Sequence, residues 1–200
     1  MREHLCSAWT VTLHHRMLQG LAAAWRRLGR DPEAAAALAD ARAVADDFQR
    51  LLIADEVLAG YAAFDQPGAP QLLLHPRDTR TGIHHSALAM VHAIADELFT
   101  PAQAQAHAAL LERTLLGPDG LRLFDRPLRC TGGPMTLFQR GESASYFGRE
   151  IGLMYRHAHL RWAEALARLG RGDALLQALR LANPIGLQAL LPQAAPRQHN

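Results

Sequence analysis

Apolar residues recur at intervals of three and four along much of this chain, which is the spacing of amphipathic helices. The first such stretch runs from about Arg2 to Leu28 and ends at Gly29. A second begins at Asp31, a good N-cap residue, and runs to about Ile53. These stretches predict a helical hairpin, with large apolar side chains on the core face of its first helix: Leu5, Trp9, Leu13, Met17, Leu18, Leu21 and Trp25.

Two further helical hairpins are predicted in the second half of the chain. One joins a helix at about 85–98 to a helix that begins after Thr100 and ends at Gly117. The other joins a helix from about 151 to Gly170 to a shorter helix that Asp173 caps. The pattern therefore predicts one all-α domain over residues 1–200. Its three hairpins need either closure into a bundle or more hairpins beside them.

Two stretches lack the helical period. The short apolar runs 57–64 and 71–74 are separated by Gln66-Pro67-Gly68, which predicts a β-hairpin or an irregular excursion. Residues 121–146 contain Gly132-Gly133-Pro134 and form a segment longer than most loops that only connect two elements. Because long loops in compact domains often carry function, candidate chemistry is expected in and around this second stretch.

Composition narrows the class of protein. The chain is 49% hydrophobic and 20% charged with a net charge of +2, which excludes a disordered chain. The basic residues are scattered, so no nucleic-acid partner is expected. The sequence has no signal-like start and no run of 18 apolar residues, which predicts a soluble, cytoplasmic protein without a membrane partner. Cys6 and Cys130 are expected to be free thiols.

The 11 histidines do not follow the spacing of a metal site. Neighbouring pairs such as His14-His15 diverge by about 100° on a helix, and no H-E-x-x-H motif is present, so no metal is expected. His157 and His159 lie two residues apart and point roughly 200° away from each other on a helix. At most one of these two histidines can therefore serve a given site.

Two polar segments have both a structural and a functional interpretation. Arg77 and Asp78, in the segment Leu74–Asp78, could form a local ion pair and cap a helix, or could belong to a sugar-binding loop. The segment Phe138–Glu142 is equally ambiguous. Its planar polar groups beside an aromatic ring suit a carbohydrate, but exposed loops have the same composition: Gln139, Arg140 and Glu142.

The charged pair Arg149 and Glu150 is a sharper candidate. Flanking glycines allow close backbone approach where a helix begins, and a helix N-terminus favours an anion. His157 follows Glu150 by seven residues and so returns to the same helix face. The alternative for His157 is a half-buried structural histidine.

These segments resemble the inverting phosphorylases of glycoside hydrolase family ninety-four, and the 1,2-β-oligoglucan phosphorylases most closely. The resemblance is carried by Gly148–His157, by Gly170-Arg171-Gly172-Asp173 and by Asn183-Pro184-Ile185, and is most specific over residues 138–185. It implies that the three hairpins form about half of an (α/α)6 barrel, its C-terminal part. It also implies attack of inorganic phosphate on a terminal β-glucosyl unit, giving α-glucose 1-phosphate without another cofactor.

The resemblance also implies roles for residues and partners. Arg149 and Glu150 match a pair that binds sugar hydroxyls, and His157 matches a phosphate-binding histidine. The general acid, an Asp in a motif like Asp-Trp-Asn-Asp, is absent from these 200 residues, so a fragment that is inactive alone is expected. Its partners would be a β-glucan oligosaccharide, phosphate and the rest of the barrel. The alternative is a noncatalytic helical module that binds carbohydrate or a protein.

Overall fold

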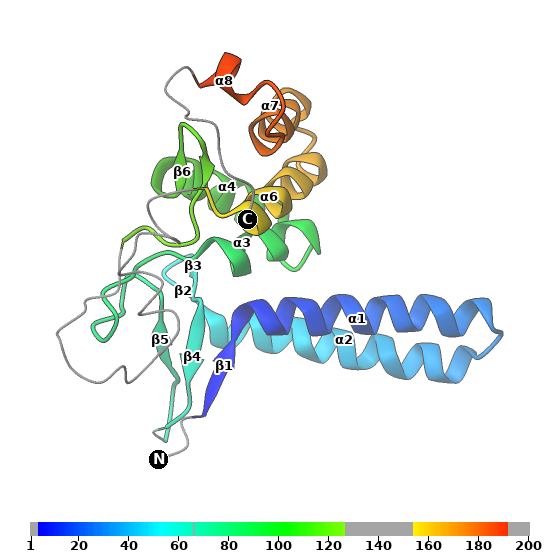
Figure 1. Ribbon diagram of the computed structural model, residues 1–200. Coiled ribbons are helices and arrows are strands. Elements are labelled where there is room, and N and C mark those ends of the chain that lie inside the picture. Colours follow the sequence, from blue (N-terminus) through cyan, green and yellow to red (C-terminus); the bar gives the residue numbers. More distant parts are fainter. Residues whose placement is uncertain (1–3, 66, 127–153, 192–200) are drawn as a thin grey trace.

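The computed structural model describes residues 4–65, 67–126 and 154–191, which form seven helices and seven short strands (Figure 1). No helix in this part of the chain is both long and apolar enough to cross a membrane. The helices are α1 (Ala8–Arg27), α2 (Asp31–Leu52), α3 (Ala87–Ala95), α4 (Pro101–Thr114), α6 (Arg156–Arg168), α7 (Gly172–Ala182) and α8 (Leu187–Leu190).

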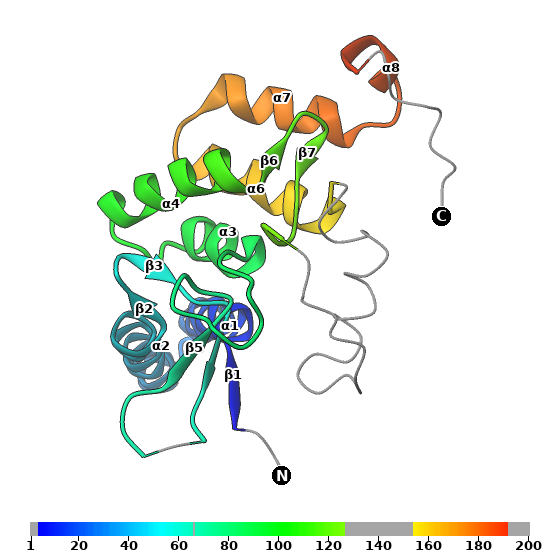
Figure 2. The same ribbon diagram turned by 90° about the vertical axis from the view of Figure 1, so that its left-hand side faces the viewer.

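The helices pair as three antiparallel hairpins, α1 with α2, α3 with α4 and α6 with α7, as the sequence predicted. Helix α3 contacts α1 and also α6, so these three helices are consecutive neighbours (Figure 2). The main core is built around Phe48, Met90, Leu111, Trp162 and Leu166. The arrangement brings the start of α1, the body of α3 and the start of α6 together, while closure into a barrel stays a prediction.

Short strands correct the all-α prediction, although the chain is predominantly helical. Three strands form an antiparallel sheet in the order β1-β4-β5, and two pairs form small hairpins. The pairing of β4 with β5 confirms the hairpin predicted within residues 57–74. The strands are β1 (Leu5–Ser7), β2 (Ile53–Ala54), β3 (Val57–Leu58), β4 (Tyr61–Ala63), β5 (Gln71–Leu73), β6 (Leu116–Gly117) and β7 (Gly120–Leu121).

The prediction that the first helix begins at about Arg2 was wrong. The side chain of Ser7 accepts a hydrogen bond from the backbone N–H of Thr10 at 3.4 Å, so Ser7 is the N-cap and the helix begins at Ala8. Residues ahead of the cap are extended and pair with β4, with Leu5 opposite Ala63. Ser7 thus divides the apolar stretch into a strand before it and a helix after it, although the apolar spacing is helical on both sides.

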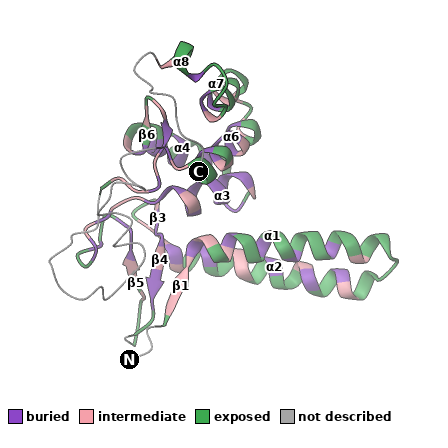
Figure 3. Ribbon diagram, in the orientation of Figure 1, coloured by how far each residue is buried: buried purple, intermediate pink, exposed green. Residues whose placement is uncertain are grey.

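The predicted apolar face of α1 was wrong in part, since Leu18 is buried and Trp9 packs against the core but other large apolar residues are exposed. The buried residues of this helix are mostly small, namely Ala8, Thr12, His15, Leu18 and Ala22. They face α2, which buries Ala34, Ala37 and Ala41, and small side chains let two helices approach closely. Leu13, Met17 and Leu21 are instead 39%, 52% and 38% exposed, and Figure 3 shows exposed residues along the outer part of this hairpin.

Buried imidazoles fasten the two small β-hairpins to neighbouring helices in the same way. The backbone N–H of Leu58, in β3, donates to Nε2 of His107 at 3.1 Å. The backbone N–H of Leu121, in β7, donates to Nδ1 of His159 at 3.1 Å. Gly120 must be glycine for this fit, since its φ is +127° and a Cβ there would lie 3.0 Å from Nδ1 of His159. Each histidine therefore acts as a structural link.

Candidate functional site

Three of the eight predicted site residues can be located: His157, Arg77 and Asp78. The other five, whose proposed role is sugar binding, lie outside the described residues, and their roles stay predictions: Arg149, Glu150, Gln139, Arg140 and Glu142.

His157 is exposed in the first turn of α6. Two hydrogen bonds hold the residues just before this helix in place. The backbone N–H of Tyr155 donates to the carbonyl oxygen of Leu121 at 2.8 Å. The backbone N–H of Met154 donates to Oδ2 of Asp119 at 3.2 Å. These bonds tie the entry of α6 to the β6–β7 hairpin, and so fix where the ring of His157 emerges.

Aromatic rings from two other helices lie near the imidazole of His157. The ring centroid of Trp9, in the first turn of α1, lies 6.0 Å away with an interplanar angle of 70°. The ring of His92, on α3, lies 6.2 Å away at 79°. Trp9 and His92 are themselves 6.2 Å apart, so the three rings form a triangle. We call Trp9, His92 and His157 the ring triangle.

The environment of the ring triangle favours a neutral His157. Burial lowers the pKa of His157 below its ordinary value, and the nearby His92 and Arg161 lower it further. A neutral imidazole carries one N–H donor and one acceptor nitrogen. His157 can therefore donate a hydrogen bond to an anionic ligand without being charged beforehand, and a bound anion would favour its protonated form.

A chain of charged groups lies behind the ring triangle. Nδ1 of His92 is 3.7 Å from Oδ2 of Asp96, whose other oxygen is 3.4 Å from Nη1 of Arg16. The same Arg16 atom is 3.7 Å from Glu164, which also pairs with Arg161. The chain of contacts therefore joins α3, α1 and α6.

Several polar atoms of this region are buried and have no hydrogen-bond partner among residues 4–65, 67–126 and 154–191. They are Nε1 of Trp9, both ring nitrogens of His92 and Oδ2 of Asp96. Buried polar atoms are usually paired, so a group of unpaired ones next to an exposed histidine marks a place of functional interest. The sequence analysis missed Trp9, His92 and Asp96 as site residues. The one available signal was the i, i+4 spacing of His92 and Asp96, which places both on one helix face.

His157 and His159 point to different surroundings, as their spacing predicted. His159 is 1% exposed, and its Nε2 donates to the carbonyl oxygen of Ala178 at 2.8 Å while Nδ1 accepts from Leu121. Both of its ring nitrogens are therefore used within the fold. Only His157, of these two histidines, is available to a ligand.

Asp78 is used by its own loop. Its carboxylate accepts hydrogen bonds from the backbone N–H groups of Leu74 at 2.8 Å, Arg80 at 2.8 Å and Thr81 at 3.0 Å, and from the Thr81 hydroxyl. Asp78 is 4% exposed. Asp78 therefore caps a loop and not a helix, and Arg77 pairs with Asp55 instead of Asp78, so the predicted local ion pair and helix cap were wrong. A role of Asp78 in sugar binding stays an untested prediction.

Replacing Asp78 by asparagine is expected to lower the free energy of unfolding by about 2 kcal/mol, because an amide group would bring its own donors against the N–H groups that the carboxylate accepts. Urea unfolding at neutral pH measures the change. The matched control is Asp47→Asn at an exposed ion pair with Arg50, where we expect at most about 0.5 kcal/mol. Equal stability of the two variants would show that the loop does not depend on this carboxylate.

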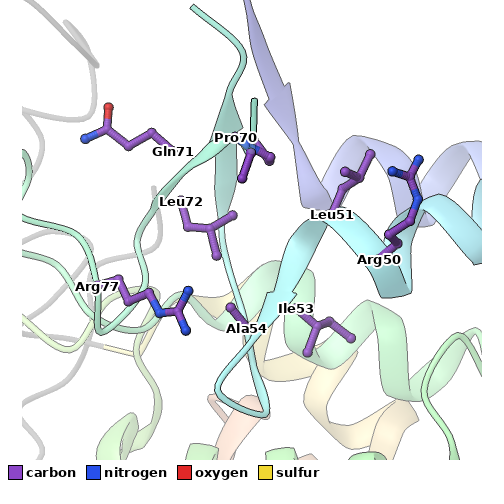
Figure 4. Close-up of a pocket in the computed structure, with 9 residues that line it drawn as sticks. Arg50, Leu51, Ile53, Ala54, Pro70, Gln71, Leu72 and Arg77 are labelled. Atoms are coloured by element: carbon purple, nitrogen blue, oxygen red, sulfur yellow. The ribbon is translucent and has the colours of Figure 1, made fainter. Parts of the chain in front are cut away.

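Arg77 lies at a separate pocket of about 340 Å³ between the end of α2 and β5 (Figure 4). Ile53, Pro70 and Leu72 give it apolar walls, and Arg50 and Arg77 stand on opposite sides. Arg77 donates to both carboxylate oxygens of Asp55, at 2.6 and 2.5 Å, and this pairing lowers the pKa of Asp55. A sugar at Arg77 would compete with that carboxylate.

Comparison with known proteins gives one informative match. No family model matches the chain. A 1,2-beta-oligoglucan phosphorylase of Listeria innocua serovar 6a is 35% identical over 201 residues. The match covers the whole of this chain but only 18% of the length of that relative.

Proposed function

We propose, from a sequence relationship to a phosphorylase that extends over the whole chain, that these residues form part of the catalytic region of an inverting β-oligoglucan phosphorylase. The resemblance found in the sequence is confirmed by this relationship. In the proposed reaction, inorganic phosphate takes a terminal glucosyl unit and gives α-glucose 1-phosphate. The whole-chain identity of 35% is the observation that carries the proposal.

His157 is proposed to bind the phosphate. The ring is exposed in the first turn of α6, where Tyr155 provides no side-chain cap for the backbone N–H groups. The N–H groups of a first helical turn and the positive end of the helix dipole favour an anion, and Arg156 adds positive charge at the same end. The combination of a helix end, an exposed imidazole and a cation supports an anionic ligand more strongly than any one of them does.

Positioning is the catalytic contribution that such residues can make. An inverting hydrolase needs a base to activate water, whereas phosphate is already an anionic nucleophile and needs to be held in line with the bond that breaks. Donor groups at the start of α6 would reduce its charge repulsion with the sugar site and the entropy lost on encounter. Protonation of the leaving oxygen would fall to an acid outside these 200 residues.

The alternative of a noncatalytic module is not favoured, because the relative that matches the whole chain is named as an enzyme. Within the proposal, Arg149, Glu150, Gln139, Arg140 and Glu142 remain candidates for contacts with sugar hydroxyls.

A segment exchange tests the proposed function. The 201 residues of the Listeria enzyme that match this chain would be replaced by the chain, and glucose 1-phosphate release from β-1,2-linked oligoglucan would be measured at varied phosphate. We expect an active chimera, with no product from the isolated chain. In the chimera, His157→Ala should raise the KM for phosphate about 10- to 100-fold, since a hydrogen bond to a charged group contributes about 1.5–3 kcal/mol.

The control for this experiment is His14→Ala, which removes an exposed imidazole from α1. Its kinetic constants should equal those of the unmodified chimera. A folded chimera without activity would contradict the proposed function. An active chimera whose phosphate KM is unchanged by His157→Ala would remove His157 from the phosphate site.

A further inference from the structure

His92 is the buried member of the ring triangle. It is 2% exposed on α3, and its ring meets those of Trp9 and His157 at interplanar angles of 52° and 79°. Neither ring nitrogen has a hydrogen-bond partner in the part of the chain that the structure describes. A histidine in such a position costs more than a phenylalanine of similar shape, because its polar atoms lose their hydration. Packing alone therefore does not explain a histidine here.

Burying the carboxylate of Asp96 at the end of α3 also costs free energy. It is the C-cap residue of α3, and its side chain is 5% exposed. The negative end of a helix dipole disfavours a carboxylate at this position. Arg16 lies 3.4 Å from one of its oxygens and compensates for part of this cost, while Nδ1 of His92 lies 3.7 Å from the other oxygen. Asp96 thus lies against His92, whose ring is 6.2 Å from that of His157.

We propose that His92, tied to Asp96, is a positioning residue that fixes the exposed imidazole of His157 against Trp9. This inference deepens the proposed function, on which its relevance to phosphate rests. Asp96 would keep a proton on Nδ1 of His92, which faces it, and would so fix the tautomer of the buried ring. His92 would then act on His157 in two ways, by packing and by charge.

The charged and titratable groups in and behind the ring triangle come from three helices. From α1 come His15 and Arg16, from α3 come His92 and Asp96, and from α6 itself come Arg161 and Glu164. Tyr155 lies beside the ring, with centroids 6.5 Å apart. Arg156 adds a further positive charge next to His157 on α6. Burial lowers the pKa of His157, and His92 and Arg161 lower it further, so removing His92 is expected to favour protonation of His157.

The test uses the 200-residue chain with labelled histidine, followed by nuclear magnetic resonance of the imidazole nitrogens as the pH is varied. His157→Asn assigns the signal of His157. In the wild-type chain we expect through-space contacts from the His157 ring to both Trp9 and His92. Absence of these contacts would overturn the proposal without any need for further variants.

Two substitutions separate packing from charge. His92→Phe keeps a ring of similar shape and removes the titratable group, so the contact between Trp9 and His157 should persist while the titration of His157 moves to higher pH. His92→Ala removes the ring, so that contact should be lost. Signals of His159 report whether each variant keeps its fold, and the signals of His14, which is exposed on α1, should be the same in all variants. Unchanged titration and contacts of His157 in both folded variants would overturn the proposal.

Inorganic phosphate, added in a separate arm, distinguishes the inference from the proposed function. If phosphate perturbs His157 in the wild-type chain and does so more weakly in His92→Ala, both stand. If phosphate leaves His157 unperturbed while the His92 variants still alter its titration, the phosphate role fails and the positioning role stands. If phosphate perturbs His157 equally in all variants, the positioning role fails and the phosphate role stands.

Discussion

Replacing His159 by alanine is expected to lower the free energy of unfolding by about 3–5 kcal/mol. The substitution would leave the N–H of Leu121 and the carbonyl oxygen of Ala178 without their partners, at 3.1 and 2.8 Å in the intact protein. It would also open a cavity where a fully buried ring joins α6, α7 and β7. Urea unfolding followed by circular dichroism measures the change.

Conservative variants divide this loss between the two hydrogen bonds. The amide oxygen of asparagine falls near the position of Nδ1 and could still accept from Leu121, whereas the amide nitrogen of glutamine falls near Nε2 and could still donate to Ala178. His159→Asn and His159→Gln should each recover part of the stability. The control is His14→Ala, expected within about 0.5 kcal/mol of wild type because the side chain is exposed. A loss below about 1 kcal/mol in His159→Ala would show that this link contributes little.

Stability is expected to fall steeply as the pH drops below about 6.5, the ordinary pKa of histidine in an unfolded chain. Burial lowers the pKa of both His107 and His159, although their hydrogen bonds to the carbonyl groups of Gln103 and Ala178 act in the opposite direction. The unfolded chain therefore binds more protons than the folded chain below pH 6.5. Stability is fully present above this pH and is lost as the pH falls toward the folded-state values.

Each such histidine contributes a slope of at most about 1.4 kcal/mol per pH unit, so the two together contribute at most about 3 kcal/mol per unit. Urea midpoints at intervals between pH 8 and pH 5 measure the effect. In His159→Gln, which cannot titrate, the slope should be shallower by about one histidine's share. Stability that stays constant from pH 7.5 to pH 5.5 would mean that these imidazoles ionise without disturbing the fold.

Local signals predicted most of the helices. Thr100 caps α4, and the side chain of Gln103 bonds back to the N–H of Thr100, so the sequence around this cap contains all that is needed to start the helix. Gly29 and Gly170 end helices with φ of +69° and +70°, which other residues adopt rarely. N-caps and helix-ending glycines act within a few residues, so these helix boundaries can be predicted without knowledge of the tertiary fold.

Long-range pairing limited the rest of the prediction. Leu5 has helical apolar spacing, but its partner Ala63 is 58 residues away along the chain, and that pairing decides that it is a strand. Apolar spacing alone did not identify the buried face of α1, because the alanines of α2 pack against small side chains such as Ala8, Thr12 and Ala22. The divergence of His157 and His159 followed from helical geometry alone. The links through His107 and His159 depend on contacts with distant β-hairpins, which the sequence does not mark.

The long hairpin of α1 and α2 has a practical use. It turns at Leu28–Arg30, away from the sheet and the shorter helices (Figure 1). At Gly29, no heavy atom lies within 4 Å of the position that a Cβ would take, and exposed loop tips of this kind tolerate insertions. A fluorescent or affinity tag inserted at this turn would sit nearly the full length of a 20-residue helix away from Trp9. The molecule thus offers an attachment point for a reporter that leaves the imidazoles of α3 and α6 undisturbed.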